Sequence, residues 1–122
     1  MTLPTDPSEV LILHNARCSK SRKTHELLTQ RGVAFEERLY LQDPLEVAEL
    51  EELARRLGRP PSEWVRRGQA EYAQAGLSDA SKDEEILAAM VRFPILVERP
   101  IVVRGDRAAV GRPPEDVLVL FE

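Results

Sequence analysis

The feature that most constrains the fold is a short apolar run followed by a polar loop and a helical segment. Val10-Leu11-Ile12-Leu13 is typical of a strand buried on both faces. A helix is predicted from about residue 18 or 19 to Arg31, and Gly32 is placed to end it. Residues 33–41 then alternate apolar and polar side chains, which predicts a second strand. Strand, helix and strand joined by short links predict a right-handed parallel unit.

The middle of the chain is predicted to be helical. A helix capped by Asp43, with a proline at its first position, is predicted to end at Gly58. Two prolines begin a second, short helix over residues 60–67. The pattern Ser81-x-x-Glu84 is typical of a capping box at the start of a third helix. Residues 43–92 are therefore expected to form an all-helical insertion.

The C-terminal part is predicted to add a hairpin and a final helix. Ile101-Val102-Val103-Arg104 is typical of a strand, and the Gly105-Asp106 turn leads to a hairpin partner at residues 107–110. Pro113 and Pro114 begin a helix that runs through Leu120. The expected class is α/β: a four-stranded mixed sheet with helices on its faces and an all-helical insertion. This arrangement matches the thioredoxin-like or glutaredoxin-like plan.

Length and composition agree with a single small domain. The 122 residues can form one compact domain with a core, placed at residues 10–122, while residues 1–9 are expected to form a flexible N-terminal extension. The net charge of −4 argues against a nucleic-acid partner. The first residues lack the features of a signal peptide, and no segment approaches the roughly 18 apolar residues of a membrane span. We expect a soluble, cytoplasmic monomer without a membrane partner.

Cys18 is the only cysteine, and it stands at the junction of the first strand and the first helix. One cysteine cannot form an internal disulfide, which suits a reducing compartment. The pKa of a free cysteine is about 8.5, and a helix N-terminus with nearby cations can bring it to roughly 3.5–7.5. A lone cysteine is usually a small buried hydrophobe, but a polar, basic neighbourhood favours a functional thiolate. Four basic or potentially basic side chains lie within four residues of it: His14, Arg17, Lys20 and Arg22.

Arginines further along the chain could complete an anion site. A helix N-terminus that stabilises a thiolate can also hold an oxyanion, and arginine offers a planar fork to paired oxygens. Arg66, Arg99 and Arg112 stand where folded segments would converge on the end of the sheet, although each alone could be a solvated surface residue. No metal site is expected, because one thiol with His14 and His25 does not form a familiar ligand pattern, and His25 is interpreted as a helix-surface residue.

Together these motifs resemble the glutaredoxin-coupled arsenate reductase family. The first is His-Asn-x-x-Cys-x-x-Ser-Arg at residues 14–22. The resemblance continues through Val65-Arg66-Arg67 and Glu71-Tyr72, and it is sharpest at residues 93–103, where Pro-Ile-Leu-Val-Glu-Arg-Pro-Ile-Val-Val stands. This Pro-Ile-Leu block begins at Pro94 and directly follows Phe93. The resemblance ends with Gly111-Arg112-Pro113 before the final helix. Nearly the whole chain is covered, and the motifs occur in the family's order.

The resemblance implies a role for each motif residue. Cys18 would be the nucleophile, and the Arg99-Pro100 peptide would be cis, as this proline commonly is in thioredoxin-like folds. The sequence departs from the family at Arg17 and Lys20, which add cations to the cysteine loop. The implied oxyanion ligands are Arg66, Arg99 and Arg112, and the implied supporting loop consists of His14, Asn15, Ser21 and Arg22.

The implied reaction is the reduction of arsenate to arsenite. Cys18 would attack arsenate, and because the chain has no second cysteine, reduction must use an outside thiol. The family uses glutathione as co-substrate and glutaredoxin to complete the cycle, with no bound cofactor. Two alternatives stay open: a non-enzymatic thioredoxin-fold regulator, and a thiol reductase with a different substrate. Regulators related to this family typically carry Cys-x-x-Cys, whereas this chain has Ser21 at the second position.

Overall fold

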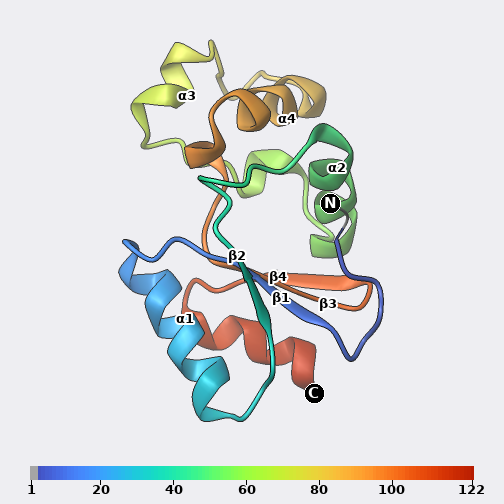
Figure 1. The fold of residues 1–122 in the computed structure, drawn as a ribbon. Coiled ribbons are helices and arrows are strands. Elements are labelled where there is room, and N and C mark those ends of the chain that lie inside the picture. The colour runs from blue at the N-terminus through green and yellow to red at the C-terminus, as the bar shows by residue number, and fades with distance from the viewer. Residues whose placement is uncertain (1–2) are drawn as a thin grey trace. The chain divides into compact units, whose positions relative to one another are not determined.

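The computed structural model describes residues 3–122, and Met1 and Thr2 lie outside the described residues. The chain divides into two compact units. The sheet unit comprises the residues up to Asp43 together with Arg99–Glu122, and the helical unit comprises Pro44–Glu98 (Figure 1). No helix of the described residues is long and apolar enough to cross a membrane.

The sheet unit is built on four strands. They are β1 (Val10–Leu13), β2 (Glu36–Arg38), β3 (Ile101–Arg104) and β4 (Arg107–Val110), in the order β2-β1-β3-β4. β1 pairs with β2 in parallel, and the β1–β3 and β3–β4 pairs are antiparallel. The mixed four-stranded sheet and the α/β class are therefore as the sequence predicted.

Two helices cover one face of this sheet. α1 (Ser19–Gln30) and the 3-10 helix η3 (Pro114–Phe121) contact each other and lie side by side (Figure 1). The predicted C-terminal helix is thus present, in 3-10 rather than α form. Burial of this apolar layer stabilises the unit through the hydrophobic effect. Its core cluster consists of Val10, Ile12, Leu28, Val102, Val117 and Leu120.

The second strand is shorter than predicted. The sequence predicted a strand over residues 33–41, but β2 contains only Glu36–Arg38. At the N-terminal end of the predicted strand, the amide of Val33 donates to the carbonyl of Leu28, a residue near the end of α1. At the other side the amides of Gln42 and Asp43 both donate to the carbonyl of Leu39. These backbone bonds turn the chain away from the sheet, so the apolar–polar alternation does not continue as a ladder.

The segment before β1 makes specific hydrogen bonds. Residues 1–9 were expected to form a flexible extension, and residues 3–9 of it are described. The guanidinium Nε of Arg104 donates to the carbonyl of Pro7 at 2.9 Å. The amide of Ser8 donates to the carboxylate of Asp6 at 2.9 Å, as an Asx turn does. The end of the segment is thus tied to β3.

The helical unit contains three α-helices and two short 3-10 helices. The α-helices are α2 (Val47–Leu57), α3 (Ala70–Gln74) and α4 (Asp83–Arg92). The 3-10 helices are η1 (Pro61–Glu63) and η2 (Pro94–Leu96), and an isolated antiparallel bridge joins Val65 to Val97. The largest fully buried side chains of this unit are Leu50, Leu53, Trp64, Met90, Leu96 and Val97.

The predicted start of α2 was wrong. The helix begins at Val47, and its cap is Glu46 rather than Asp43. The side chain of Glu49 accepts the amide of Glu46 at 3.1 Å, which supplies one half of a capping box. Asp43 is engaged elsewhere, because its carboxylate pairs with the guanidinium of Arg38 at 3.3 Å. The predicted end was correct, since Gly58 stands at the C-cap with φ +66°.

Two further predictions in this unit need correction. α4 begins at Asp83, because Glu85 accepts the amide of Lys82 at 3.0 Å, while the hydroxyl of Ser81 accepts the amide of Ser78 instead. The predicted helix over residues 60–67 ends after Glu63.

The residues that follow pair with another segment. The amide of Arg66 donates to the carbonyl of Leu96 at 2.8 Å, and the amide of Glu98 donates to the carbonyl of Trp64 at 3.0 Å. These long-range bonds hold residues 64–66 extended and prevent the helix from continuing.

Candidate functional site

Cys18 is the N-cap of α1, directly after β1 and a four-residue loop. Its φ and ψ of −93° and 124° are extended, and its carbonyl accepts the amide of Arg22 at 3.0 Å in the first helical bond. The thiol is partly buried. The positive end of the helix dipole and the first-turn amides, which have no carbonyl partner within the helix, therefore face the sulfur, as an anion requires.

The surroundings lower the pKa of Cys18. Burial raises the pKa, but the amides of Ser21 and Lys20 and the guanidinium of Arg99 donate hydrogen bonds to the sulfur and outweigh it. The charge of Arg99 acts in the same direction. The pKa of Cys18 consequently lies below its ordinary value, which favours the thiolate, the nucleophilic form of cysteine.

The loop before Cys18 is held by side-chain hydrogen bonds. Nδ1 of His14 lies 2.7 Å from Oγ of Ser21, and both side chains are buried. The amide of Asn15 donates to the same hydroxyl at 3.0 Å. The guanidinium of Arg22 donates to the carbonyl of Ala16 at 2.9 Å. All four residues predicted for the supporting loop are thus brought together beside Cys18.

Arg99 and Arg112 lie at the same end of the sheet unit. The Arg99–Pro100 peptide is cis, as the resemblance implied, and the Arg112–Pro113 peptide is cis as well. Nη1 of Arg112 donates to the carbonyl of Arg99 at 3.2 Å. Since Arg99 in turn bonds the sulfur of Cys18, these two predicted anion ligands form a connected group with Cys18.

Gly111 allows this group to assemble. A Cβ at this position would lie 2.6 Å from Oγ1 of Thr24 and 2.8 Å from Cγ of Pro100. Real Cβ atoms do not come so close to their neighbours, so a side chain here would push the end of β4 away from α1 and from Pro100. The glycine therefore lets the chain that carries Arg112 approach Cys18's helix.

Arg66 belongs to the helical unit. There its guanidinium donates to the carbonyl of Ile95 at 3.2 Å. The side chain is partly buried. Its predicted role as a third anion ligand stays a prediction.

The sequence missed a pair next to the cysteine loop. Nε2 of His25 is within hydrogen-bonding distance of the carboxylate of Glu37, and the His25 ring centroid lies 5.2 Å from that of His14. The ring of Phe35 meets His25 edge-on at 4.9 Å. His25 therefore lies on the surface of the helix but also contacts side chains of the cysteine loop and of the segment around β2. A signal was present, because His25 follows Ser21 by four residues and so lies on the same face of α1.

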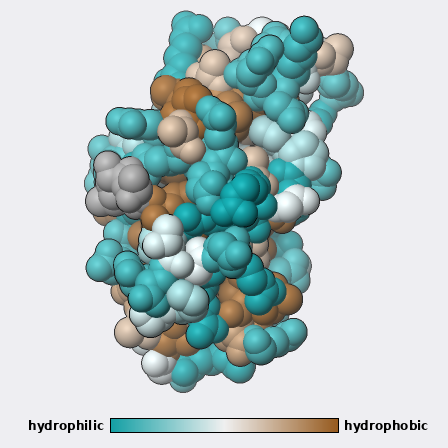
Figure 2. Space-filling view, turned by 90° about the vertical axis from the view of Figure 1, so that its right-hand side faces the viewer, coloured by the Kyte–Doolittle hydropathy of each residue, from teal (hydrophilic) through white to brown (hydrophobic). Residues whose placement is uncertain are grey.

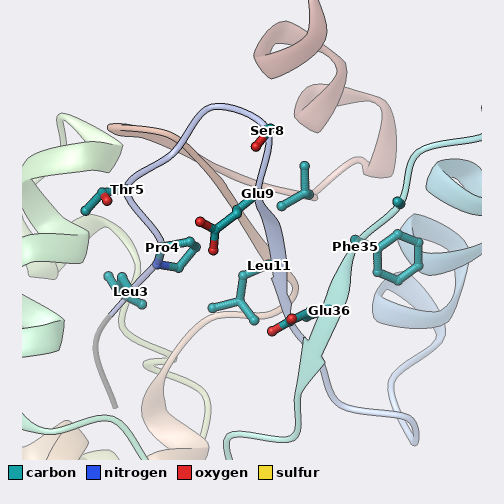
Figure 3. Close-up of a pocket in the computed structure, with 10 residues that line it drawn as sticks. Leu3, Pro4, Thr5, Ser8, Glu9, Leu11, Phe35 and Glu36 are labelled. Carbon is teal, nitrogen blue, oxygen red and sulfur yellow. The ribbon is translucent and has the colours of Figure 1, made fainter.

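The described residues offer no metal centre, since they contain no group of three or more His, Cys, Asp or Glu side chains able to hold an ion. A cavity of about 580 Å³ lies between the segment before β1 and strand β2, lined among others by Glu9, Leu11 and Phe35 (Figure 3). Cys18 does not line this cavity, so the cavity is separate from the sulfur site.

The chain thus combines a thioredoxin-like fold with a cysteine at a helix N-terminus whose pKa is lowered by backbone amides and by Arg99. A family model described as the ArsC family matches residues 13–120. The chain therefore belongs to the ArsC family, which confirms the resemblance drawn from the sequence.

Individual proteins and solved structures are also similar to this chain over most of its length. The chain is 46% identical over 112 residues to the uncharacterized protein YfgD of Escherichia coli K12, and the alignment covers 90% of the chain and 94% of the relative. It is 40% identical over 111 residues to an arsenate reductase of Neisseria meningitidis serogroup A, with 89% and 95% covered. The solved structure of an arsenate reductase from Vibrio cholerae matches with a TM-score of 0.87 at 39% identity, covering 92% of this chain and 97% of that one.

Proposed function

We propose that this protein is an arsenate reductase in which Cys18 is the nucleophile and in which glutathione and glutaredoxin supply the reducing thiols. The observation that carries the proposal is the set of hydrogen bonds from two amides and Arg99 that lowers the pKa of Cys18. A thiolate fixed beside a guanidinium can attack an oxyanion that the same guanidinium holds. The names of the Neisseria and Vibrio relatives support arsenate as that oxyanion.

The arginines supply the binding of the substrate. Arg99 already contacts the sulfur, and Arg112 is bonded to the backbone of Arg99. Both can present planar pairs of N–H donors to arsenate oxygens. Arg66 from the helical unit is proposed as the third ligand. The amides at the N-terminus of α1 add donors that suit the same anion.

The first chemical step forms a bond between sulfur and arsenic. The Cys18 thiolate attacks As(V), and one oxygen of the substrate leaves as water after protonation. The adduct holds arsenic in its original oxidation state, since the sulfur replaces one oxygen ligand. The low pKa of Cys18 keeps the attacking sulfur ionised.

The second stage needs thiols from outside the chain, because Cys18 is its only cysteine. The thiolate of glutathione attacks the sulfur of Cys18, the S–As bond breaks, and its electron pair stays on arsenic. Arsenic is thereby reduced to As(III) and leaves as arsenite, while Cys18 and glutathione form a mixed disulfide. The thiol of glutaredoxin then attacks the glutathione sulfur and releases Cys18 as a thiolate. In total, one arsenate and two thiols yield one arsenite, one disulfide and one water.

The proposed setting follows from the chemistry. A cycle that consumes reduced thiols suits the cytoplasm, where thiols are kept reduced. The reaction requires no bound cofactor, since the electrons come from the thiols. A monomer is proposed, with arsenate, glutathione and glutaredoxin as its only partners.

The deciding experiment supplies arsenate, glutathione and glutaredoxin together and measures arsenite. Arsenite should form with the natural protein and not with Cys18→Ser, whose circular dichroism spectrum should be unchanged. Phosphate should inhibit by occupying the anion site, but thiols do not reduce it. If no arsenite forms with all three components present, a thiol reductase of another substrate or a non-enzymatic regulator would replace this proposal.

A further inference from the structure

A second concave feature lies between α1 and the start of η3, the two helices that lie side by side in Figure 1. It is a groove of about 350 Å³. One wall carries Lys20, Lys23 and Glu26 of α1, and the other carries Pro113 and Glu115. We refer to it as the lysine groove.

Both walls of the lysine groove begin at residues of the cysteine site. The amide of Lys20 donates to the sulfur of Cys18. Pro113 directly follows Arg112, whose guanidinium bonds the carbonyl of Arg99, the residue whose own guanidinium bonds the same sulfur. The end of the groove that carries Lys20 and Pro113 therefore adjoins the cysteine site.

Three of the four charged side chains that line the groove make no hydrogen bond or ion pair with another described residue through their charged groups. Within the described part of the chain, no hydrogen bond or ion pair engages the ammonium group of Lys20 or of Lys23, nor the carboxylate of Glu115. The two lysines are three residues apart, so they lie on one face of α1 with a rise of about 4.5 Å between them. The fourth charged side chain of the groove, Glu26, already accepts a hydrogen bond from the side-chain amide of Gln30 at 3.1 Å. The three uncommitted charges suit a ligand with two carboxylates and an ammonium group.

We propose that the lysine groove binds the reducing co-substrate, a small peptide thiol of the glutathione class. This inference rests on the proposed function and names the place where its first thiol docks. The two carboxylates of the tripeptide pair with Lys20 and Lys23, and its ammonium group pairs with Glu115. An extended tripeptide spans about 10 Å, and the wall from Lys20 to Gln30 rises about 15 Å along α1. The tripeptide therefore fits along the groove, with its thiol between two anchored ends.

The lysine groove and the arsenate site suit ligands of different shape. Arsenate is a compact anion that the arginines and the helix amides can surround. The groove is longer, and its cations are the ammonium groups of Lys20 and Lys23 rather than the arginines and backbone amides of the sulfur site. The lysines are thus expected to affect the affinity for the peptide thiol more than the affinity for arsenate.

The direct test measures binding without turnover. S-methylglutathione, which has no free thiol, is titrated into the natural protein, into Lys23→Gln and Lys23→Glu, and into Lys82→Gln, and the dissociation constant is read from NMR shifts. Lys82 is the matched control, because it is an exposed lysine in the helical unit. Lys23→Gln should weaken binding roughly 3- to 10-fold and Lys23→Glu further still, and Lys82→Gln should not weaken it. Equal affinity in all four proteins, or no binding to the natural protein, would overturn the proposal that the lysine groove binds the peptide thiol.

A kinetic test adds a thiol that the groove cannot recognise. With glutathione as reductant, Lys23→Gln should raise the KM for glutathione by a similar factor and move the KM for arsenate less than about twofold. With uncharged 2-mercaptoethanol as reductant, Lys23→Gln and the natural protein should turn over at the same rate. An equal loss with both thiols overturns the subsite. If the proposed function is wrong, no thiol will yield arsenite in the turnover assay. The binding titration does not depend on turnover, so it would still show whether the groove binds S-methylglutathione.

Discussion

Nδ1 of His14 lies 2.7 Å from the hydroxyl oxygen of Ser21. The same hydroxyl accepts the amide of Asn15, and Ser21 is fully buried. Among the described residues, Nδ1 is the acceptor within reach of the hydroxyl proton. We therefore assign Ser21 as the donor and His14 as the neutral imidazole with its proton on Nε2. Burial lowers the pKa of His14, which agrees with this assignment.

Ser21→Ala should destabilise the protein and raise the pKa of Cys18. The substitution leaves Nδ1 of His14 and the amide of Asn15 without their common partner, and an unsatisfied buried group costs about 1–3 kcal/mol. The pKa rises because the hydroxyl holds the turn whose Ser21 amide bonds the sulfur. Urea denaturation and ultraviolet titration of the thiolate measure the two effects. Ser19→Ala, at an exposed position of the same turn, is the control, and equal stability of both variants would refute the argument.

Arg99→Leu should raise the pKa of Cys18 more than Arg17→Leu does. Arg99 bonds the sulfur and acts on it by charge, whereas Arg17 is only its neighbour in sequence and is exposed. Cysteine alkylation by iodoacetamide, followed over a series of pH values, reports the thiolate fraction. The alkylation curve of Arg99→Leu should move to higher pH, and that of Arg17→Leu should stay near the natural one. A larger shift for Arg17→Leu would contradict the assignment.

Arg66→Leu tests whether the helical unit contributes to the anion site. If Arg66 binds arsenate, its loss should cost about 1.5–3 kcal/mol of substrate binding, seen as a higher KM for arsenate. Arg67→Leu is the adjacent control, because Arg67 already pairs with Asp79. Circular dichroism should confirm that both variants fold, since Arg66 also bonds the carbonyl of Ile95. Equal KM values for the two variants would remove Arg66 from the site.

Hydrophobic pattern and turn residues were sufficient to predict three strands of the sheet, whereas β2 is shorter than its apolar–polar alternation predicted. Val10–Leu13 and the hairpin around Gly105 are local signals, and their strands pair as expected. Helix starts were predicted less well, because adjacent acidic residues compete to cap them. Glu85 rather than Glu84 accepts the cap amide of α4, and only the three-dimensional path of the chain decides between them.

The site was predictable where it is local and not where it depends on long-range contacts. The loop of His14, Ser21 and Cys18 could be predicted because it spans one strand–helix junction. The sequence predicted that the helix N-terminus and cations within four residues would favour the thiolate. The amides of Ser21 and Lys20 act as predicted, but the guanidinium that lowers the pKa belongs to Arg99, far away in the sequence. Side chains adjacent in a chain point in different directions, so sequence neighbourhood does not measure distance to the sulfur.

The distribution of charged residues over the surface also could not be predicted from the sequence. Hydrophilic side chains cover most of the face in Figure 2, with hydrophobic residues gathered in separate areas. This agrees with a composition in which 31% of residues are charged. Composition predicts such a surface, but it does not indicate which charged residues form a groove or a site.

His14→Gln should flatten the decline of stability with falling pH. Burial lowers the pKa of His14, with His25 and Arg22 acting in the same direction and Glu37 opposing them. The unfolded chain therefore binds a proton more readily than the folded chain just below the ordinary histidine pKa of about 6.5. The stability that His14 contributes is present above this value and is lost as the pH falls through the window below it. Urea denaturation between about pH 7 and pH 5 measures the slope. His25→Gln retains His14 and its burial, the largest cause of the lowered pKa, and should therefore keep most of the slope. Parallel curves for His14→Gln and the natural protein would contradict the prediction.

Gly111→Ala should destabilise the protein and weaken the anion site. The new Cβ would lie 2.6 Å from Oγ1 of Thr24 and 2.8 Å from Cγ of Pro100, so β4 must shift. Overpacking of this kind costs about 1–3 kcal/mol, which urea denaturation detects. Because Arg112 follows this position and bonds the carbonyl of Arg99, the shift should also raise the KM for arsenate. Gly68→Ala is the matched control, since a Cβ there meets nothing within 4 Å. A variant at position 111 as stable as the one at position 68 would show that the close approach of β4 to α1 can relax without cost.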